Sequence, residues 1–420
     1  MRLQLKFYLG LIFCFTCVQI SSAQEVTQVN DPALNETNKS REDSLSPKKP
    51  TKLNETEVNF LFTYYDQDGN HSPVTGGIGT EALTDYSSTV IIYVPLDSSS
   101  RLGVNAGVNY YTSASTDRID IDMSSASSAD IRGQMYVTYN QEKPNKRSRW
   151  YVSGGLSSES DYLSTSLGAG WSHESADRNR EFGIAAQIFL DRWQLIFPDE
   201  LRGDSIATAV NTDRRNSYSL SLTYSQVLSR RLQFSISADW VYQSGLLTTP
   251  FHRVYFQEQE SARIERLPGT RFKFPLGLRV HYFLSDFLIL KFNYRIYWDS
   301  WGIFANTFNM ETPIKLGNYF TIYPFYRYHK QSATEYFALF KQHRLSNHFY
   351  TSDFDLSSFE SHKYGLGLRY SPLYGLGRFK FPNQKHVTMF KALELRYANY
   401  TRIDGLDAFL MSLAMTFLIR

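Results

Sequence analysis

Apolar and polar residues alternate with a period of two along most of the chain beyond residue 54. Residues 232–242 place large apolar side chains between Gln, Ser and Asp, and the same alternation recurs in 217–225, 288–298 and 409–419. Successive side chains of a β-strand point to opposite faces, so each segment would have one apolar and one polar face. The segments are near the ~10 residues that cross a bilayer as a tilted strand.

The connections between these segments alternate between short and long. Tight connections such as 229–230 and 285–286 alternate with the long connections 66–85, 113–130, 194–215, 244–271 and 330–360. Short turns on one side and longer loops on the other are typical of outer-membrane barrels. We predict an all-β fold, a transmembrane antiparallel up-and-down β-barrel of about sixteen strands, with fourteen as the alternative. The segments are 55–65, 86–96, 101–112, 131–141, 149–157, 161–173, 181–193, 216–227, 231–243, 272–284, 287–299, 302–314, 319–329, 361–372, 388–401 and 407–419.

Aromatic residues gather at both ends of the predicted strands. Tyr64-Tyr65, Tyr110-Tyr111 and Tyr297-Trp298 precede long loops, whereas Tyr93 and Tyr139 precede tight turns. A soluble sheet would also alternate, but two aromatic girdles favour a barrel whose apolar face contacts lipid. The alternation is weakest in segments 149–157 and 302–314.

The N-terminal part of the chain differs from the rest. Residues 1–23 have a charged start, an apolar segment and a Ser-Ser-Ala ending, which predicts a cleaved signal peptide. Residues 24–53 lack aromatic side chains and read as a flexible periplasmic leader, so the barrel would occupy 54–420. This organisation predicts a protein of the bacterial outer membrane that contacts lipid and the barrel-assembly machinery, with Phe417 as the aromatic residue near the C-terminus.

Composition excludes several classes of function. Both cysteines of the 420 residues lie in the predicted signal, so the mature chain would lack disulfides, thiolate catalysis and Cys-ligated metals. Removing that signal leaves 42 Lys and Arg against 41 Asp and Glu, which gives no electrostatic reason to expect nucleic acid binding.

Several long motifs resemble a family of Gram-negative exported proteins that is catalogued only as a domain of unknown function. They are residues 57–71, 75–81, 113–120, 249–256 and 272–279, and the likeness covers about residues 54–420. The resemblance implies an outer-membrane barrel. It implies no activity, ligand or catalytic residue.

Two acidic loops are candidate cation sites. The first carries Asp66, Asp68 and Asn70 around Gly69, and the second carries Asp117, Asp120, Asp122 and Asp130. Both would open on the same rim, and alternating oxygen ligands suit a hard cation such as Ca²⁺. The alternative is an Asx-type turn whose side chains bond their own backbone.

The polar face of the second half is strongly basic, whereas that of the first half is small or neutral. A basic ladder along the lumen would concentrate anions and exclude cations. Alternatively, these charges pair with Glu311, Glu394 and loop carboxylates. The ladder consists of Lys273, Arg279, His281, Lys291, Arg295, Arg327, Lys363, Arg369 and Arg396.

Other candidate chemistry is weaker. Residues 203–206 (Gly-Asp-Ser-Ile) are similar to the nucleophile block of one lipase class, but they lie in an external loop, and the Asp-x-x-His pattern, Asp68 to His71, is upstream instead of near the C-terminus. We therefore predict that the protein is not an enzyme. The alternative is a hydrolase at the external rim, where the loop residues His71, His252, His343 and His348 would lie. The aromatic loop 330–360 is expected to fold inward as a constriction, the alternative being an exposed binding surface.

These patterns predict a channel or uptake porin for small polar or anionic solutes. The alternative is a barrel that anchors a binding or assembly module made of the acidic and aromatic loops. The solute and the oligomeric state are not encoded in any motif.

Overall fold

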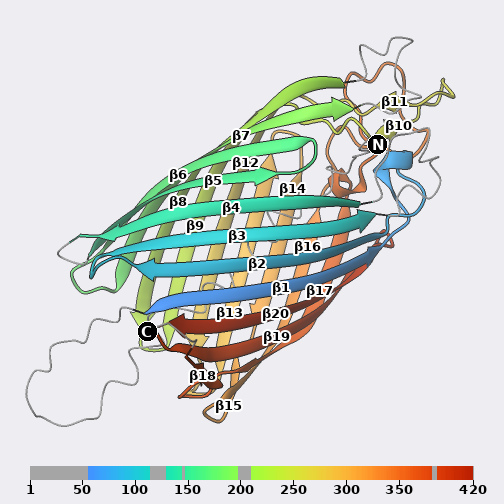
Figure 1. Cartoon of the computed structure of the whole chain (residues 1–420). Coiled ribbons are helices and arrows are strands. Elements are labelled where there is room, and N and C mark those ends of the chain that lie inside the picture. Colours follow the sequence, from blue (N-terminus) through green and yellow to red (C-terminus); the bar gives the residue numbers. More distant parts are fainter. Residues whose placement is uncertain (1–54, 114–128, 144–146, 197–209, 381–385, 420) are drawn as a thin grey trace, which may run out of the picture.

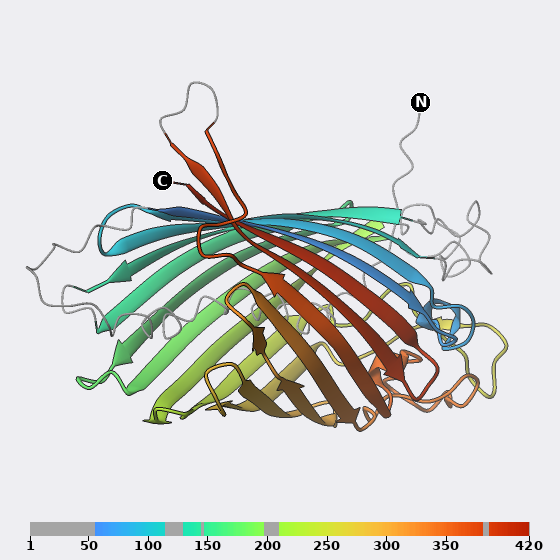
Figure 2. The ribbon, with the colours of Figure 1, turned by 90° about the horizontal axis from the view of Figure 1, so that it is seen from below.

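The computed structural model describes residues 55–113, 129–143, 147–196, 210–380 and 386–419. Sixteen antiparallel strands close into a barrel (Figure 1), which confirms the predicted fold and strand number. Closure is made by the first and last strands, since Thr56 lies opposite Ile419 and Asp68 lies opposite Asp407. Figure 2 shows the wall running through the blue and green strands and returning through the yellow and brown ones.

Each of the sixteen predicted segments corresponds to one strand. The strands are β1 (Thr56–Asp68), β2 (Leu83–Pro95), β3 (Ser100–Ser113), β4 (Ala129–Glu142), β5 (Ser148–Ser158), β6 (Tyr162–Glu174), β7 (Arg180–Ile196), β8 (Val210–Ser229), β9 (Leu232–Gly245), β12 (Thr270–Phe283), β13 (Ile289–Asp299), β14 (Phe304–Glu311), β16 (Phe320–Gln331), β17 (Phe359–Tyr370), β19 (Thr388–Arg402) and β20 (Asp407–Ile419).

Four further strands are very short. β15 (Ile314–Leu316) continues β14 alongside β16, and β18 (Gly377–Phe379) pairs with β19. The interruption between β14 and β15 includes Pro313, which has no N–H to donate to the ladder. This explains the weak pattern of the predicted segment 302–314. In the loop between β9 and β12, β10 (Arg253–Val254) and β11 (Arg263–Ile264) form a separate two-stranded sheet.

The two ends of the barrel differ in loop length, as predicted. The end that carries Ile419 has tight turns, for example between β2 and β3 and between β8 and β9. At the other end, the connections 69–82, 246–269 and 332–358 are long, and they contain the 3-10 turns η2 (Pro73–Thr75) and η5 (Phe354–Leu356). We call this second end external. Figure 1 shows β10 and β11 at the end opposite the C-terminus.

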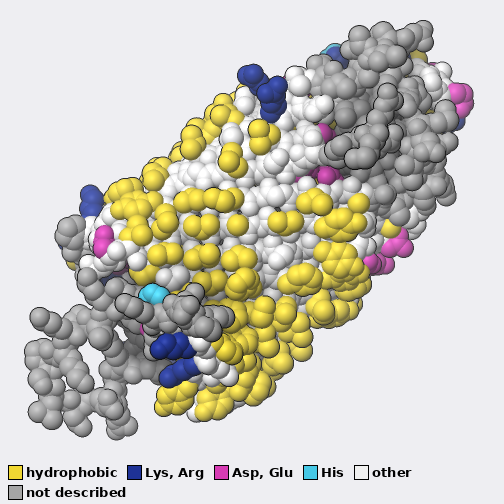
Figure 3. Space-filling view, viewed as in Figure 1, with side chains coloured by type: hydrophobic (Ala, Val, Ile, Leu, Met, Phe, Trp, Pro, Cys, Tyr) yellow, Lys and Arg dark blue, Asp and Glu magenta, His cyan; other side chains and the backbone are white. Residues whose placement is uncertain are grey.

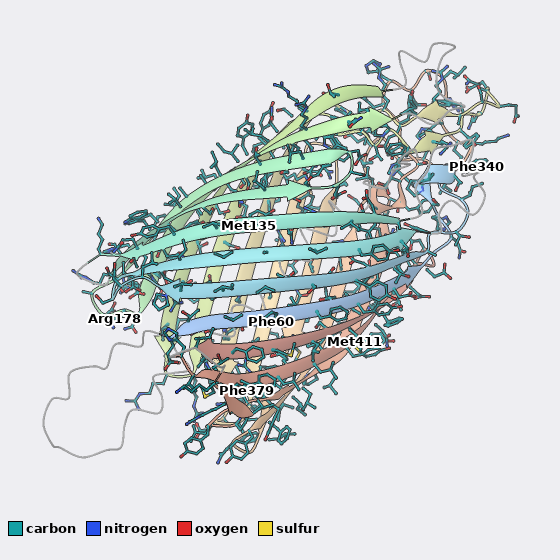
Figure 4. All side chains as sticks on the ribbon, in the orientation of Figure 1. Phe60, Met135, Arg178, Phe340, Phe379 and Met411 are labelled. Carbon is teal, nitrogen blue, oxygen red and sulfur yellow. The ribbon has the colours of Figure 1, made fainter. Side chains whose placement is uncertain are left out.

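The outer face of the wall is apolar. Ile131 and Leu167 are 58% and 65% exposed, and Phe60, Met135 and Met411 lie along the wall in Figure 4. Figure 3 shows apolar side chains over the middle of the visible face, with charged side chains toward its ends. A band of exposed apolar side chains flanked by polar ends is the surface that a lipid-embedded barrel requires. Among the described residues, no helix is long and apolar enough to cross a membrane.

Aromatic rings on the outer face contact one another across strands near both ends. Near the external end, Tyr64 lies 5.0 Å from Tyr86 and 5.4 Å from Phe409 between ring centroids. Near the other end, Phe390 stacks on Phe417 at 4.8 Å. Such rings belong at the two membrane–water interfaces, as the sequence pattern suggested.

Candidate functional site

A row of cationic and amide side chains crosses the inner wall from β12 to β17. Arg279 lies opposite Asn293, which lies opposite Asn309. Asn309 in turn lies opposite Arg327, and Arg327 lies opposite Lys363. Because exposed apolar residues occupy the alternate positions of these strands, this row faces the lumen. Arg327 also donates a hydrogen bond through Nε to Asn309 Oδ1.

Two carboxylates pair with part of the predicted basic ladder. Glu311 accepts from Lys291 Nζ at 3.4 Å and from Arg396 Nη1 at 2.9 Å. Glu394 accepts from Arg396 Nε at 2.6 Å and lies 4.0 Å from Arg369 Nη1. Three ladder residues therefore form one ion-pair network with the two carboxylates that the sequence alternative named.

The remaining ladder residues also lie on the inner wall. His281 Nδ1 is 3.0 Å from Gln233 Nε2, Lys273 lies opposite Asp299, and Arg295 lies opposite Thr307. With Asp299 opposite Lys273, the carboxylates on the inner faces of β9 to β19 that accompany the ladder are Asp239, Asp299, Glu311 and Glu394. The eight Lys and Arg side chains of the ladder exceed these four carboxylates by four charges.

The opposite part of the inner wall is lined by small neutral side chains. On β3 to β8 the inward positions include Asn105, Gly107, Ser164, Ser166 and Ser219, as the alternation predicted. The lumen is therefore electrostatically one-sided, with the positive charge concentrated on β12 to β19.

The three long external loops pack against one another, and we call them the external cap: residues 69–82, 246–269 and 332–358. Arg253 Nη1 donates to the carbonyl oxygen of Val74 at 2.7 Å, and Ser352 Oγ donates to that of Arg253 at 2.7 Å. The rings of His71 and Phe354 stack at 3.8 Å. The cap therefore joins segments from distant parts of the chain.

The cap has its own apolar core. Val254 and Phe256 are 0% and 1% exposed, and the ring of Phe256 meets that of Tyr350 edge-on at 4.9 Å. Phe340, labelled in Figure 4, packs against Tyr255 with centroids 4.9 Å apart. Many aromatic rings of the loop 330–360 thus pack within the cap.

The cap also rests on the inner rim of the barrel. Gln331 Nε2 donates to the carbonyl oxygens of Asp355 and Ser357 at 2.9 and 2.8 Å. Inward side chains at the external ends of four strands are buried, namely Tyr65, Gln67, Gln243, Ser361 and Arg402. Of these, Gln67 Nε2 donates to the carbonyl oxygen of Glu81 in the cap at 3.1 Å, and Arg402 pairs with Asp355 of the cap.

A buried cluster of titratable groups fastens two loops of the cap. His252 Nδ1 lies 3.3 Å from Glu265 Oε1 and 4.0 Å from Asp353 Oδ2. Glu265 also accepts from Thr249 N at 2.8 Å and from Thr351 Oγ1. Burial opposes protonation of His252, but Glu265 and Asp353 outweigh it and raise the pKa of the imidazole. Burial, together with Asp355, raises the pKa of the Asp353 carboxyl.

Glu81, in the first loop of the cap, is a buried acid. Its desolvation raises the pKa of its carboxyl to about 9, with Asp355 adding to the shift and Arg402 opposing it. The side chain is therefore neutral at pH 7. The proton is on the carboxyl group of Glu81, inside the cap.

The first predicted acidic loop forms local turns. Asp68 Oδ1 accepts from the N–H of Gly69 at 2.8 Å, which is a bond to the neighbouring backbone but not the two-residue bond of an Asx turn. Asp66 accepts from Tyr64 and from Thr84 at 3.2 and 3.0 Å. Asp117, Asp120 and Asp122 lie outside the described residues.

The described residues bring two other groups together at distances that would suit an ion. These are His252 with Glu265 and Asp353, and Asp130 with Glu159 and Asp161. Of these six, the acidic-loop pattern included Asp130 alone. The second group could have been suspected from the sequence. The predicted topology places the start of segment 131–141 and the connection between segments 149–157 and 161–173 at the same rim.

The loop histidines make contacts within the cap. His343 Nε2 lies 3.0 Å from the carbonyl oxygen of Thr351, and burial lowers the pKa of its ring. The His348 ring meets that of Phe349 at 4.6 Å. Residues 203–206 lie outside the described residues.

Comparison with known families and structures gives a family and a set of distant barrels. The model of the family described as "Protein of unknown function (DUF3570)" matches residues 111–373, more than half of the chain. No curated protein matches the sequence.

The similar solved structures are distant. A bacterial polysaccharide outer membrane secretin shares 12% identity, with a TM-score of 0.43, over 88% of this chain and 99% of its own. OccK1 from Pseudomonas aeruginosa shares 8% at a TM-score of 0.38 over 87% and 98%. The siderophore receptor PirA from Acinetobacter baumannii shares 11% at 0.43, over 84% of this chain and 54% of its own. The chain thus spans about half the length of that receptor.

Proposed function

This chain belongs to the family described as Protein of unknown function (DUF3570), and that description names no activity. We therefore propose its function from the structure of its own barrel. The protein is an outer-membrane channel that passes small polar or anionic solutes, and the external cap restricts entry to its lumen. Its outer face lies in the lipid of the bacterial outer membrane, where the barrel-assembly machinery inserts it.

The one-sided charge of the lumen carries this proposal. Arg279, Arg327 and Lys363 belong to one row across the wall, and the eight Lys and Arg side chains of the ladder exceed the inward carboxylates of β9 to β19 by four charges. Charges on a low-dielectric wall focus their field into the lumen and raise the local concentration of anions. Guanidinium and ammonium groups are strong hydrogen-bond donors to anions.

Conductance across a planar bilayer tests the proposal. The refolded full chain is expected to open steadily, and a KCl gradient should give a reversal potential of the sign for chloride preference. The triple variant Arg279→Gln, Arg327→Gln, Lys363→Gln should move that potential toward zero. Arg230→Gln, in an exposed turn, is the matched control and should leave it unchanged. Cation preference in the native chain would refute the anionic assignment.

A second function is favoured by the cap itself. A folded cap with its own apolar core also exposes Ile78, Leu339 and Leu345, which are 36%, 46% and 42% exposed. Such a surface suits a barrel that anchors a binding module. A correctly folded barrel that never conducts would support this alternative and contradict the channel.

A further inference from the structure

Three carboxylates converge on the external rim between β4 and the turn that joins β5 to β6. Asp130 is the second residue of β4, and Glu159 and Asp161 lie in the turn after Ser158. One oxygen of each carboxylate lies within 4.8 Å of the other two. The wall brings them together because β4 pairs with β5, with Gly133 opposite Ser158.

Two of these carboxylates are buried with an oxygen left unsatisfied. Glu159 and Asp161 are each 8% exposed. Within the described residues, Glu159 Oε1 and Asp161 Oδ1 accept no hydrogen bond. Buried carboxylate oxygens without a partner are costly, so each normally meets a donor, a cation or a proton.

The charges around the cluster do not balance. One guanidinium pairs with the cluster, since Arg132 Nε lies 3.5 Å from Glu159 Oε1. Tyr111 donates to Glu159 Oε2 at 3.2 Å, and Ser160 Oγ donates to Asp130 Oδ2 at 3.0 Å. Three ionised carboxylates beside one guanidinium carry two negative charges in excess, which is the charge that one divalent cation neutralises.

We propose that Asp130, Glu159 and Asp161 bind a Ca²⁺ ion at the external rim of the barrel. The ligand atoms are carboxylate oxygens, and hard cations of this kind take oxygen ligands in flexible arrangements. No imidazole or thiolate belongs to the group, so the site favours Ca²⁺ over Zn²⁺. The ion would tie the start of β4 to the β5–β6 turn. The site shares Asp130 with the second acidic loop that the sequence suggested, but its other two ligands come from the β5–β6 turn, and it does not depend on the channel proposal.

Protonation is the competing way to satisfy the cluster. Burial raises the pKa of Glu159 to about 7 and that of Asp161 to about 6. Binding should therefore be measured near pH 8, which is above both of these pKa values.

Terbium luminescence gives a direct test on the refolded full chain. Tb³⁺ replaces Ca²⁺ at oxygen sites, and Tyr111 is close enough to sensitise its emission. We expect emission that Ca²⁺ displaces, together with an apparent melting temperature that rises with CaCl₂ and falls with EDTA. Asp161→Asn and Glu159→Gln should each weaken Ca²⁺ binding at least tenfold. Asp213→Asn removes an exposed carboxylate on the same rim and should bind as the native chain does.

Either of two results would overturn the proposal. One is a native chain whose emission and melting temperature do not respond to Ca²⁺. The other is an Asp161→Asn chain that is folded by circular dichroism and heat-dependent gel mobility and that still binds Ca²⁺ with native affinity. Displacement by Mg²⁺ at equal concentration would contradict the choice of Ca²⁺. None of these readouts uses conductance, so failure here and failure of the channel proposal are separable.

Discussion

Arg402 of the inner wall and Asp355 of the external cap form a buried ion pair that joins the two parts of the molecule. Their side chains are 2% and 12% exposed. Arg402 Nη2 also donates to the carbonyl oxygen of Phe354 at 3.0 Å, and its guanidinium lies 3.9 Å from the centroid of the Phe359 ring. One side chain of β19 thereby holds the segment around η5 on the rim.

Replacing Arg402 should loosen the cap without opening the barrel. Arg402→Gln leaves Asp355 and Asp404 without their guanidinium, and breaking a buried ion pair costs about 3–5 kcal/mol. We expect faster hydrogen exchange and earlier proteolysis in 332–358, with strand protection retained. Lys330→Gln removes an exposed pair with Glu360 and should change little. Equal protection of 332–358 in both variants would contradict a fastening role for Arg402.

The cap should be less stable at alkaline pH. The folded pKa of Glu81, about 9, is above the unfolded value, so folding binds a proton there. Its contribution is present below about pH 4.5 and is lost as the pH rises through about 9. His252, with its raised pKa, acts in the same direction above about pH 6.5. The protection of 69–82, measured as the exchange rate relative to that of the unstructured peptide at the same pH, should fall between pH 6 and 9 in the native chain.

Variants at position 81 separate this effect from general alkaline loosening. Glu81→Gln keeps the size of the side chain without the ionisable group, so its protection should depend less on pH. Glu335→Gln, an exposed residue of the cap, should follow the native profile. A Glu81→Gln profile as steep as the native one would show that another group is responsible.

Removing a lumen carboxylate should increase anion preference. Glu394→Gln leaves Arg396 with Glu311 alone and takes the carboxylate away from Arg369. The reversal potential in a KCl gradient should move further toward that of chloride. Asp286→Asn, in a tight turn, serves as the control. A movement toward cation preference would show that the ladder does not set the selectivity.

Replacement by alanine should affect two glycines of the wall differently. A Cβ at Gly365 would lie 2.1 Å from the carbonyl oxygen of Tyr397 and 2.6 Å from Cζ of Phe325, whereas one at Gly133 would meet nothing within 4 Å. Overpacking of this kind costs about 1–3 kcal/mol. The folded fraction, measured by heat-dependent gel mobility, should fall in Gly365→Ala and stay native in Gly133→Ala. Equal folded fractions would mean that β17 and β19 can separate locally.

The strands could be predicted from sequence because alternation is local. The residues of each segment alone indicate which of its faces contacts lipid. The weak alternation of segment 302–314 is explained by Pro313, which interrupts the strand. The pairing of Glu311 and Glu394 with the ladder was foreseen as an alternative for the same reason, since all these residues have inward parity. Their actual partners required the register, which places Arg369 opposite Glu394.

The cap could not be predicted, because its contacts join distant segments. Arg253 and Val74 are 179 residues apart, and nothing in either loop indicates the other. Part of the cluster of Asp130, Glu159 and Asp161 could be predicted from the sequence. Asp130 stood out in an acidic loop, whereas Glu159 and Asp161 lie in a short turn between two strands that no sequence pattern had connected with that loop.

The seam between β1 and β20 makes assembly of the barrel all-or-none. β1 pairs with β2 on one side, but on its other side the thirteen residues from Thr56 to Asp68 pair with the final strand. A nascent chain that stopped before Asp407 would leave two open sheet edges, and hydrocarbon offers no water to satisfy their N–H and C=O groups. Truncated chains should therefore be cleared by periplasmic proteases instead of persisting as partial pores.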